Sequence, residues 1–506
     1  MPKKLSTLPL SLRGPKPGTP LYRWLYDELR ARILGGQLRP GMRLPATRDL
    51  AVQYGLSRPT TVTAFEQLRS EGYVEGRVGS GTYVSQTLPD ELLQAPRAGS
   101  AGTKRRRRIA LSAYAQRLQK SPREVVRNIL HSRAAGRDGS LAPRAFRAGQ
   151  PALAAFPTDL WAQVATRRLR RVSTTLLAGG EALGYRPLRD AVAEYLSTSR
   201  GVNCSPEQVL IISGVQEALD RAAHLLLDPG DTVWMEEPGY PRAASSFSAV
   251  GAKICPVPVD AEGLDLEAGQ RRWPRPRLVY VTPAHQFPLG VTMSLRRRLS
   301  LLEWARKSGT VIFEDDYDSE YRYSGRPVPA LQGLDRAGVV IYAGSFTDAL
   351  FPSLRLGYLV APPDMVDIFG AAGSVSTHHP PLIDQAILCD FIVEGHFARH
   401  VRKMRELYAE RLGVLLSAAR EQLAGLLEIS DVEAGLRTVG WLQQGISAER
   451  VAKAAAERDV EVVPLGRYAY GRSRPNGLVL GFAAVDGREL RRGVTELARV
   501  LGEYVR

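Results

Sequence analysis

The chain has 506 residues, more than a single hydrophobic core usually organises, so we expect two or three domains. Hydrophobic residues make up 44% and charged residues 24%, and no stretch approaches the roughly 18 uncharged apolar residues of a membrane span. The apolar run near the N-terminus is too short for a secretory signal. Cys204, Cys255 and Cys389 lie far apart, which excludes a disulfide framework or a zinc site. We therefore expect a cytoplasmic protein.

The net charge of +16 is concentrated near the N-terminus. Residues 1–145 contain 26 of the 68 basic residues and 10 of the 52 acidic ones, which leaves 42 of each sign in residues 146–506. Such asymmetry is typical of a polyanion-binding module joined to a neutral one, because neutralising phosphates supplies most of the nonspecific affinity for DNA. A merely solvated basic surface is the alternative, and the motifs that follow make it less favoured.

Residues 21–69 carry the pattern of three helices. Leu21, Leu25, Leu29 and Ile33 recur every four residues, which predicts a helix over 21–34. We expect Thr47 to cap a short helix that ends at Gly55, and Ser57 to cap a longer one over 58–69. The Gly-Leu-Ser turn between them is typical of a helix-turn-helix. In the longer helix, the inward face is expected to carry Val62, Phe65 and Leu68.

The next segment, YVEGRVGSGTYV, alternates apolar and polar residues around glycines, which predicts a β-hairpin with Arg77 at its tip. Arginine and small hydroxyls at the start of the preceding helix suit the major groove, where they reach base edges. Residues 19–87 together resemble the GntR-type winged helix of bacterial regulators. The residue pattern and this resemblance predict contacts with a double-stranded DNA operator from Arg43, Arg48, Arg58, Thr60, Thr61, Arg77, Gly79 and Gly81.

Residues 88–145 mix proline, glycine, alanine, serine and arginine with little apolar period, which predicts a basic flexible linker. A helix is expected to interrupt it around residues 121–132. The run Lys104–Arg108 either grips the DNA backbone or keeps the linker solvated and extended.

From about residue 146, apolar runs alternate with helical stretches: VLIIS, TVWME, KICPVPV, RLVYVTP, TVIFEDD and GVVIYAGS. This alternation predicts an α/β fold with a largely parallel sheet. Polar residues follow several strands. A Ser-Gly turn at residues 213–214 precedes a helix whose amides can cradle a phosphate, and carboxylates cluster in FEDDYDSEY. Carboxylates at a solvated strand end are the alternative interpretation.

The residues after 146 resemble fold-type I pyridoxal phosphate enzymes in six ordered segments: LGYRPLRDAVAEYL, SGVQEALD, DPGDTVWMEEPGYP, TPAHQFPLGVTMSLRRRLSLLEWA, FEDDYDSEYRY and SFTDALFPSLRLGYL. With the winged helix, nearly the whole chain resembles the MocR subfamily of GntR regulators. This implies an aminotransferase-like domain over 146–506, of the class I/II type, with a small C-terminal α/β subdomain from about residue 375. It also implies a homodimer, with exchanged DNA-binding heads as one option, and a small amine or amino acid as effector.

The resemblance further implies a site for pyridoxal 5′-phosphate. Tyr240 would stack on the pyridine ring, Asp315 would pair with its protonated nitrogen, and Tyr317 would face its 3′ oxygen. A carboxylate that keeps this nitrogen protonated makes the ring an electron sink. The phosphate would be surrounded by Gly214, Val215, Gln216, Ser345, Thr347 and Arg355. The pair His285-Gln286 stands where ordinary aminotransferases have asparagine; the regulator family shares the histidine, which favours a regulator over an enzyme.

The sequence departs from the family at the covalent anchor. Asp348 stands where the lysine that forms a Schiff base with the cofactor belongs, and a carboxylate cannot form an imine. We therefore assign no catalytic residue, expect the covalent attachment to be lost, and expect weak or absent binding of free pyridoxal phosphate, because Asp348 adds negative charge near an anionic cofactor. Val215 replaces the usual serine of the phosphate turn, and Val479 replaces the arginine that aminotransferases use for the substrate carboxylate.

Three functions remain open at this point. The first is a DNA-binding transcription regulator with a ligand-sensing aminotransferase-like domain; the second is a working aminotransferase with a fused DNA-binding head; the third is a DNA-binding protein with a wholly degenerate domain. Asp348 argues against the second, and we favour the first. His396 and His400 are four residues apart on an expected helix, but no third ligand accompanies them, so we predict no metal site.

Overall fold

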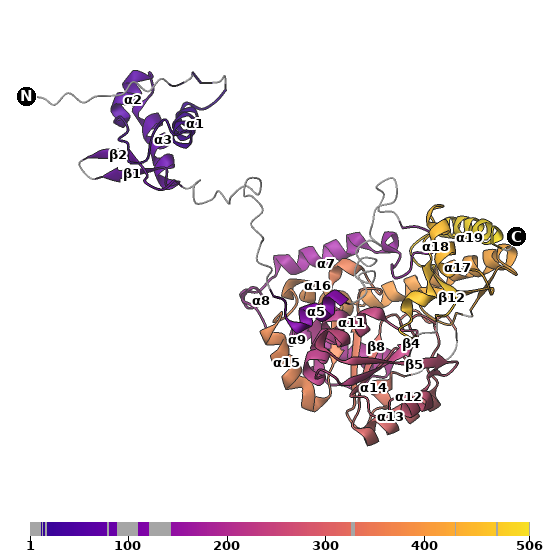
Figure 1. The fold of residues 1–506 in the computed structure, drawn as a ribbon. Coiled ribbons are helices and arrows are strands. Elements are labelled where there is room, and N and C mark those ends of the chain that lie inside the picture. Colours follow the sequence, from indigo (N-terminus) through magenta and orange to yellow (C-terminus); the bar gives the residue numbers. More distant parts are fainter. Residues whose placement is uncertain are drawn as a thin grey trace, which may run out of the picture. The chain divides into compact units, whose positions relative to one another are not determined.

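The computed structural model describes residues 12, 14–15, 18–77, 80–88, 110–120, 143–324, 329–430, 432–471 and 474–504. The chain divides into two compact units, Met1–Ile109 and Ala110–Arg506, which can be followed in Figure 1. Within the described part, no helix is long and apolar enough to cross a membrane.

The first unit is a winged helix built from three helices and a hairpin. Its elements are α1 (Leu21–Leu34), α2 (Thr47–Gln53), α3 (Arg58–Ser70), β1 (Val74–Arg77) and β2 (Gly81–Val84). Leu25, Leu29 and Ile33 of α1 pack with Leu50 of α2 and Leu68 of α3 in a single core. The helices and the hairpin are therefore where the sequence pattern predicts them.

Two local predictions for this unit are wrong. The N-cap of α2 is Ala46, because Thr47 is already helical and its side chain makes no capping hydrogen bond. In α3, Thr61 and Ala64 are buried while Val62 is only half-buried. Positions 61, 64, 65 and 68 follow the 3.6-residue period of a helix more closely than 62, 65 and 68 do. The predicted cap of α3 is confirmed, since Ser57 Oγ accepts from the Thr60 N–H at 3.2 Å.

Part of the predicted linker belongs to the second unit. Residues of α5 (Ala113–Lys120) pack against α11 (Pro241–Val250), where Arg117 Nε donates to the Ala249 carbonyl at 2.8 Å. The Tyr114 ring also lies against this unit, so the prediction of a continuous tether is wrong for this segment. The helix expected around 121–132 and the run Lys104–Arg108 lie outside the described residues.

The second unit is organised by an eight-stranded mixed sheet in the order β3-β10-β9-β8-β7-β4-β5-β6. The strands are β3 (Val209–Ile212), β4 (Thr232–Glu237), β5 (Lys253–Asp260), β6 (Gly263–Leu264), β7 (Leu278–Val281), β8 (Val311–Asp316), β9 (Val340–Ser345) and β10 (Gly357–Val360). All six predicted strands are present, and β4, β5, β7, β8 and β9 run parallel. The sequence did not indicate β10, which is antiparallel to both β3 and β9.

Helices cover both faces of this sheet, as Figure 1 shows. Val233 and Met235 of β4 pack with α10 and α11, whereas Trp234 packs with α12 and α13, because successive strand residues point to opposite faces. The helices of this part are α7 (Thr158–Arg170), α8 (Thr174–Ala178), α9 (Arg186–Arg200), α10 (Val215–Leu226), α11, α12 (Leu266–Arg272), α13 (Leu295–Ser308), α14 (Leu331–Leu334), α15 (Val366–Val375) and α16 (Leu382–Val393).

A smaller subdomain follows, with an antiparallel sheet in the order β11-β12-β14-β13. Its elements are α17 (His396–Gln422), β11 (Leu427–Ile429), β12 (Arg437–Leu442), α18 (Ala448–Ala456), β13 (Val463–Pro464), β14 (Gly477–Gly481) and α19 (Gly487–Gly502). Because α16 packs against α7 and α9, this subdomain begins at α17, later than the predicted boundary near residue 375. Phe146, at the other end of the unit, is buried and bridges to Gly481 of β14.

Candidate functional site

The predicted phosphate-binding segments meet where β10 lies between β3 and β9. Gly214 precedes α10 with a φ of 105°, and Ser345 ends β9. A Cβ added at Gly357 of β10 would stand 3.2 Å from the Gly214 Cα and 3.5 Å from the Ser345 Cα, so the two segments are neighbours. The Ser345 hydroxyl donates to Thr347 Oγ1 at 2.7 Å and accepts from the Thr347 N–H at 3.1 Å. The start of a helix beside two hydroxyls is an arrangement that suits an anion.

The other predicted phosphate residues contribute less polar chemistry. Val215 begins α10 and offers no hydroxyl. Gln216 Nε2 donates to Ser246 Oγ at 2.6 Å, which leaves Gln216 Oε1 buried without a partner. Arg355 is exposed, has a φ of 55°, and forms no ion pair with any described residue. Its guanidinium therefore remains available to an external anion.

One carboxylate oxygen of Asp315 accepts a hydrogen bond, and the other has no hydrogen-bond partner among the described residues. Asp315 lies near the end of β8, and its Oδ2 accepts from the Tyr280 hydroxyl at 2.7 Å. Its Oδ1 is buried without a partner. Burial, reinforced by Asp316, Asp318 and Asp348, raises the pKa of Asp315 to about 7, although the Tyr280 hydrogen bond opposes this rise. A cationic group beside Oδ1 would satisfy it, which is what a protonated ring nitrogen offers. Sequence reasoning missed Tyr280, a residue inside an apolar strand.

Aromatic rings stand close to this carboxylate. Tyr240 and Tyr317 both contact Phe287 edge-on, with ring centroids 5.3 and 5.9 Å away. The guanidinium of Arg437, at the start of β12, lies 4.8 Å from the Phe287 centroid and 5.1 Å from that of Tyr317. Burial raises the pKa of Tyr240 to about 12, so its phenol stays protonated at neutral pH. Sequence reasoning missed Arg437, because nothing in its own strand pattern links it to residues 150 positions earlier.

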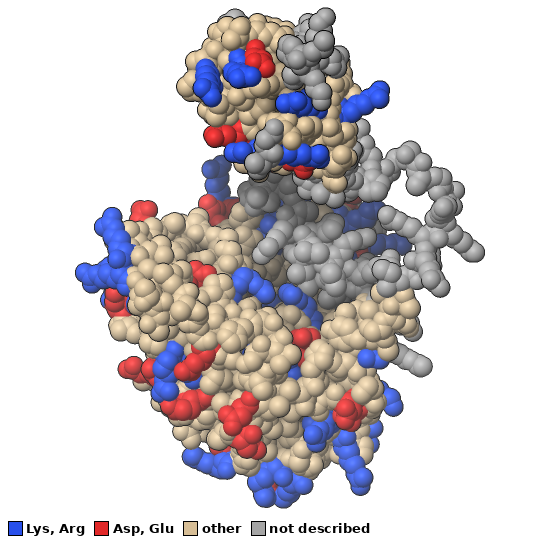
Figure 2. All heavy atoms as spheres, turned by 90° about the vertical axis from the view of Figure 1, so that its left-hand side faces the viewer, with Lys and Arg blue, Asp and Glu red and all other residues tan. Residues whose placement is uncertain are grey.

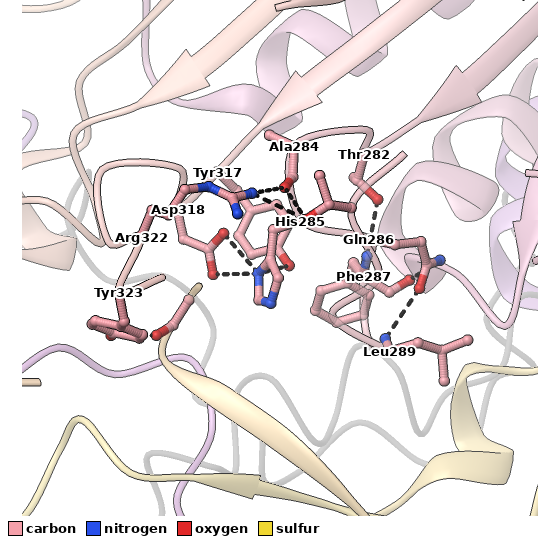
Figure 3. A network of polar contacts seen from close by, with 12 residues as sticks. Thr282, Ala284, His285, Gln286, Phe287, Leu289, Tyr317, Asp318, Arg322 and Tyr323 are labelled. Atoms are coloured by element: carbon pink, nitrogen blue, oxygen red, sulfur yellow. Dashed lines mark hydrogen bonds and ion pairs between the residues drawn. The ribbon is translucent and has the colours of Figure 1, made fainter. Parts of the chain in front are cut away.

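His285 and Asp318 hold the Tyr317 hydroxyl. His285 Nδ1 lies 3.0 Å from both carboxylate oxygens of Asp318 and 3.1 Å from the Tyr317 hydroxyl, as Figure 3 shows. A Cβ at Gly435 would stand 2.0 Å from His285 Cε1, so only glycine leaves room for this ring. The adjacent Gln286 donates to the Pro238 carbonyl at 2.9 Å. His285 thus links the Asp318 carboxylate to the Tyr317 hydroxyl.

Asp348, which the sequence resemblance aligns with the family's lysine, has a carboxylate that pairs with no described residue. Its backbone carbonyl accepts from the Tyr321 hydroxyl at 3.2 Å, but its side chain bonds to no described residue. Burial raises the pKa of Asp348 to about 6; the positive charge of Arg437 opposes this rise, and Asp318 and Glu320 add to it. An amine nucleophile is therefore missing here.

In the winged helix, the predicted arginines are exposed. Arg58, at the start of α3, forms no ion pair within the described part of the chain, whereas Arg48 lies 3.3 Å from Asp49. Arg43 reaches over the wing, because a Cβ at Gly81 would stand 2.9 Å from its Nε. Basic side chains lie at several places over this unit in Figure 2, with acidic ones between them.

The remaining predicted DNA-contacting residues differ from one another. Thr61 is fully buried and its hydroxyl lies 3.4 Å from the Ser57 carbonyl, so it supports α3 and we withdraw it from the proposed contacts. The Thr60 hydroxyl lies 2.7 Å from Ser57 Oγ. Arg77, at the end of β1, pairs with Glu75 at 2.8 Å and stacks on the Tyr83 ring. Gly79 lies outside the described residues.

The histidines on α17 do not form a metal site. His396 bonds to Glu394 at 3.1 Å, whereas His400 packs edge-on against Phe156 with 5.5 Å between centroids. Burial lowers the pKa of His400 to about 4. Among the described residues, no group of three potential ligands gathers in one place.

Two families match this chain. The bacterial regulatory proteins of the gntR family match residues 21–84, and the aminotransferases of class I and II match residues 148–496. The chain is 42% identical to the probable rhizopine catabolism regulatory protein MocR of Rhizobium meliloti, over 94% of this chain and 93% of that protein. It is 29% identical to the HTH-type pyridoxine biosynthesis transcriptional regulator PdxR of Corynebacterium glutamicum, over 98% of each.

A solved structure extends the likeness to the fold. LysN, the alpha-aminoadipate aminotransferase of Thermus thermophilus complexed with N-(5′-phosphopyridoxyl)-L-leucine, superimposes with a TM-score of 0.70 at 30% identity, over 78% of this chain and 98% of LysN. The predicted fold class is confirmed by this match and by the two families. The full-length relatives are named as regulators, which confirms the predicted role. The chain therefore belongs to the MocR subfamily of GntR-type transcription regulators, in which a winged helix is joined to an aminotransferase-like domain.

Proposed function

We propose that this regulator binds its operator through the winged helix and responds to a ligand held, without a covalent bond, in a non-catalytic aminotransferase-like domain. The observation that carries the proposal is the contrast between Asp315 and Asp348. Asp315 keeps a free buried oxygen that suits a pyridinium nitrogen, whereas Asp348 stands where a lysine would have to be.

The residues fit the ring and the phosphate of pyridoxal phosphate but not its covalent anchor. Asp315 would pair with the ring nitrogen, Tyr240 would stack on the ring, and Tyr317 would face the 3′ oxygen. The phosphate would lie among Gly214, Val215, Gln216, Ser345, Thr347 and Arg355. When bound, this cofactor supplies an electron sink. Because Asp348 is anionic, we propose that the aldehyde form binds weakly and that a form of the cofactor with a cationic amine binds better.

Loss of catalysis follows from the same residue. Aminotransferases use their lysine both to exchange the substrate and to move a proton, and a carboxylate replaces only part of the second role. Transamination also requires a group that binds the substrate carboxylate. Val479 cannot do this, because its apolar side chain lies in a cluster with Val439 and Leu465. We therefore propose regulation without transamination. A working aminotransferase with a fused DNA-binding head is the less favoured alternative.

On the DNA side, we propose that a homodimer reads two half-sites. Arg58 and Thr60 begin the recognition helix, Arg43 and Arg48 flank it, and Gly81 and Arg77 belong to the wing. Gly79 stays a contact predicted from the sequence. Two weakly binding heads joined in one dimer gain affinity through effective concentration. Exchange of heads between protomers is compatible with the linker that the sequence predicts before α5. Since chromosomal DNA is the proposed target, we place the protein in the cytoplasm.

The test is operator binding by the full-length protein, measured by fluorescence anisotropy. Operator affinity is compared without ligand and with pyridoxal phosphate, pyridoxamine phosphate, or each of these with an amino acid. A ligand changes the affinity only if it binds the two conformational states differently. We expect at least one of these to shift the operator affinity. If the affinity is the same in all of them, the domain is wholly degenerate and only the DNA-binding function stands.

A matched control uses Asp315→Asn, which removes the carboxylate that would pair with the ring nitrogen. This variant should keep operator binding in the absence of ligand and lose the response to ligand. A response that persists unchanged would show that the effect arises elsewhere in the chain.

A further inference from the structure

Arg437 is a buried cation that forms no ion pair with any described residue. Its side chain is 7% exposed, and its Nε is buried without any hydrogen bond. The guanidinium lies over the rings of Phe287 and Tyr317, and no described residue accepts a hydrogen bond from it or forms an ion pair with it. Cation–π contact recovers only part of what a guanidinium loses when it leaves water. A group held in this way is ready for an anion that the chain itself does not supply.

The carboxylates around Arg437 differ in what they already bind. Asp318 is committed to His285 Nδ1 through both of its oxygens, at 3.0 Å each. Asp348 is not committed, since its side chain makes no hydrogen bond within the described residues. Burial raises the pKa of Asp348, and the positive charge of Arg437 opposes this rise. Burial acts to lower the pKa of Arg437, and nearby groups that include Asp348 outweigh it. No ion pair joins the two side chains, so each lacks a partner of opposite charge within the described residues.

At position 479, where the resemblance predicts the arginine that binds the substrate carboxylate, this chain has an uncharged valine. Val479 of β14 pairs in register with Val439 of β12, and both are fully buried in an apolar cluster. Arg437 begins β12 two residues before Val439 and pairs with Gly481. A cation is therefore present on the neighbouring strand, on the side that contacts the rings of Phe287 and Tyr317.

We propose that Arg437 and Asp348 form a two-charge subsite for a zwitterionic ligand of the amino-acid class. The Arg437 guanidinium donates to a carboxylate of the ligand, and the Asp348 carboxylate accepts from its ammonium group. A ligand with both charges satisfies both groups, whereas one with a single charge leaves a buried partner unpaired. This inference rests on the proposed function and gives it a ligand class; no bond to the chain forms or breaks.

The experiment is isothermal titration calorimetry on the full-length protein, with and without added pyridoxal phosphate. The probes are leucine, glutamate and lysine, each compared with the amine that lacks its α-carboxylate and the acid that lacks its α-amine. The variants are Arg437→Gln, Arg437→Lys and Asp348→Asn. The control is Arg399→Gln, which changes an exposed arginine of α17 that has no part in the proposed subsite. We expect at least one amino acid to bind the unmodified protein more tightly than its two analogues.

The variants should then switch specificity in opposite directions. Arg437→Gln should weaken the amino acid by roughly tenfold to a hundredfold and remove its advantage over the matched amine. Asp348→Asn should remove its advantage over the matched acid. Arg437→Lys should retain part of the preference, and Arg399→Gln all of it. A misfolded variant would lose all three probes equally, so the switch itself is the diagnostic result.

Several outcomes overturn the inference. The first is that no amino acid binds the unmodified protein. The second is that Arg437→Gln still prefers the amino acid over the matched amine. The third is that a variant which keeps its unfolding temperature loses the amino acid, the amine and the acid equally. Operator binding separates this failure from that of the proposed function. Amino acids that bind through Arg437 without changing operator affinity would refute only the function. Amino acids that change operator affinity equally in the unmodified protein and Arg437→Gln would refute only the subsite.

Discussion

Arg58 of the winged helix and Arg437 of the aminotransferase-like domain are charges without an ion pair among the described residues, and they lie in opposite environments. In the winged helix, Arg58 is exposed at the start of α3, where water can solvate it. In the aminotransferase-like domain, Arg437 and one oxygen of Asp315 are buried and unpaired. An exposed charge costs little stability, whereas a buried one destabilises the ligand-free fold. The unpaired charge of the winged helix therefore costs little stability, whereas those of the second unit carry a cost that the proposed ligand would remove.

The sharpest way to break this comparison is to restore the anchor. We expect no cofactor to be fixed on the unmodified protein when pyridoxal phosphate is added and reduced with borohydride, because Asp348 offers no amine. Asp348→Lys should give a stoichiometric label at position 348, measured by peptide mass spectrometry. Asp348→Asn serves as the control and should give none. A stoichiometric label on any lysine near the site in the unmodified protein would contradict the expectation.

The loss of folding stability caused by burying Asp315 can be measured as a function of pH on the cofactor-free protein. Burial raises the pKa of Asp315 from 3.8 to about 7, so folding favours its protonated form. The stability that this group contributes is fully present below about pH 4 and is lost as pH rises through 7. Asp315→Asn should therefore gain stability relative to the unmodified protein over this window, by a few kcal/mol, on the order implied by about three pKa units. Differential scanning calorimetry at several pH values measures it.

The control for that experiment is Asp364→Asn, an exposed acid before α15. Its stability difference from the unmodified protein should not change over the same pH window. If the stability difference between Asp315→Asn and the unmodified protein also stays constant with pH, Asp315 is solvated or paired in solution.

A smaller effect is expected in the exposed unit. Arg58→Ala should weaken operator binding by about 1–3 kcal/mol if the side chain reaches a base edge, and Arg48→Ala should have a similar effect. Arg69→Ala, at the other end of α3, is the matched control and should have a smaller one. None of these three variants should change the unfolding temperature, since the three arginine side chains are exposed. Unchanged affinity for both Arg58→Ala and Arg48→Ala in a gel-shift titration would remove this helix from the groove.

The smallest change concerns the basic run Lys104–Arg108. Replacing these residues by glutamine should flatten the dependence of operator affinity on salt concentration without changing which bases matter, because phosphate contacts carry no sequence information. An unaltered slope would make this run a spacer that only keeps the linker solvated.

Local pattern alone determined much of this protein. The spacing of Leu25, Leu29 and Ile33 gave α1, the glycines at 55 and 81 marked the turns, and the alternation of apolar runs with helices gave the strands of the large sheet. Asp315 and the unusual Asp348 were identified by the resemblance to a known family, which rests on ordered motifs along the chain. These signals are local because helix periods, caps and turns depend on residues a few positions apart.

Only the tertiary structure decided which of these residues are free to act. Thr61 looks like a groove contact in the sequence, yet packing turns it inward, because the core selects one face of α3. The helix α5 lies in a stretch typical of a tether, and its contacts with α10 and α11 attach it to the second unit. Arg437 and Phe287 are 150 residues apart, and the sheet of the small subdomain brings them together. Burial and pairing depend on such distant contacts, which no short segment of sequence encodes.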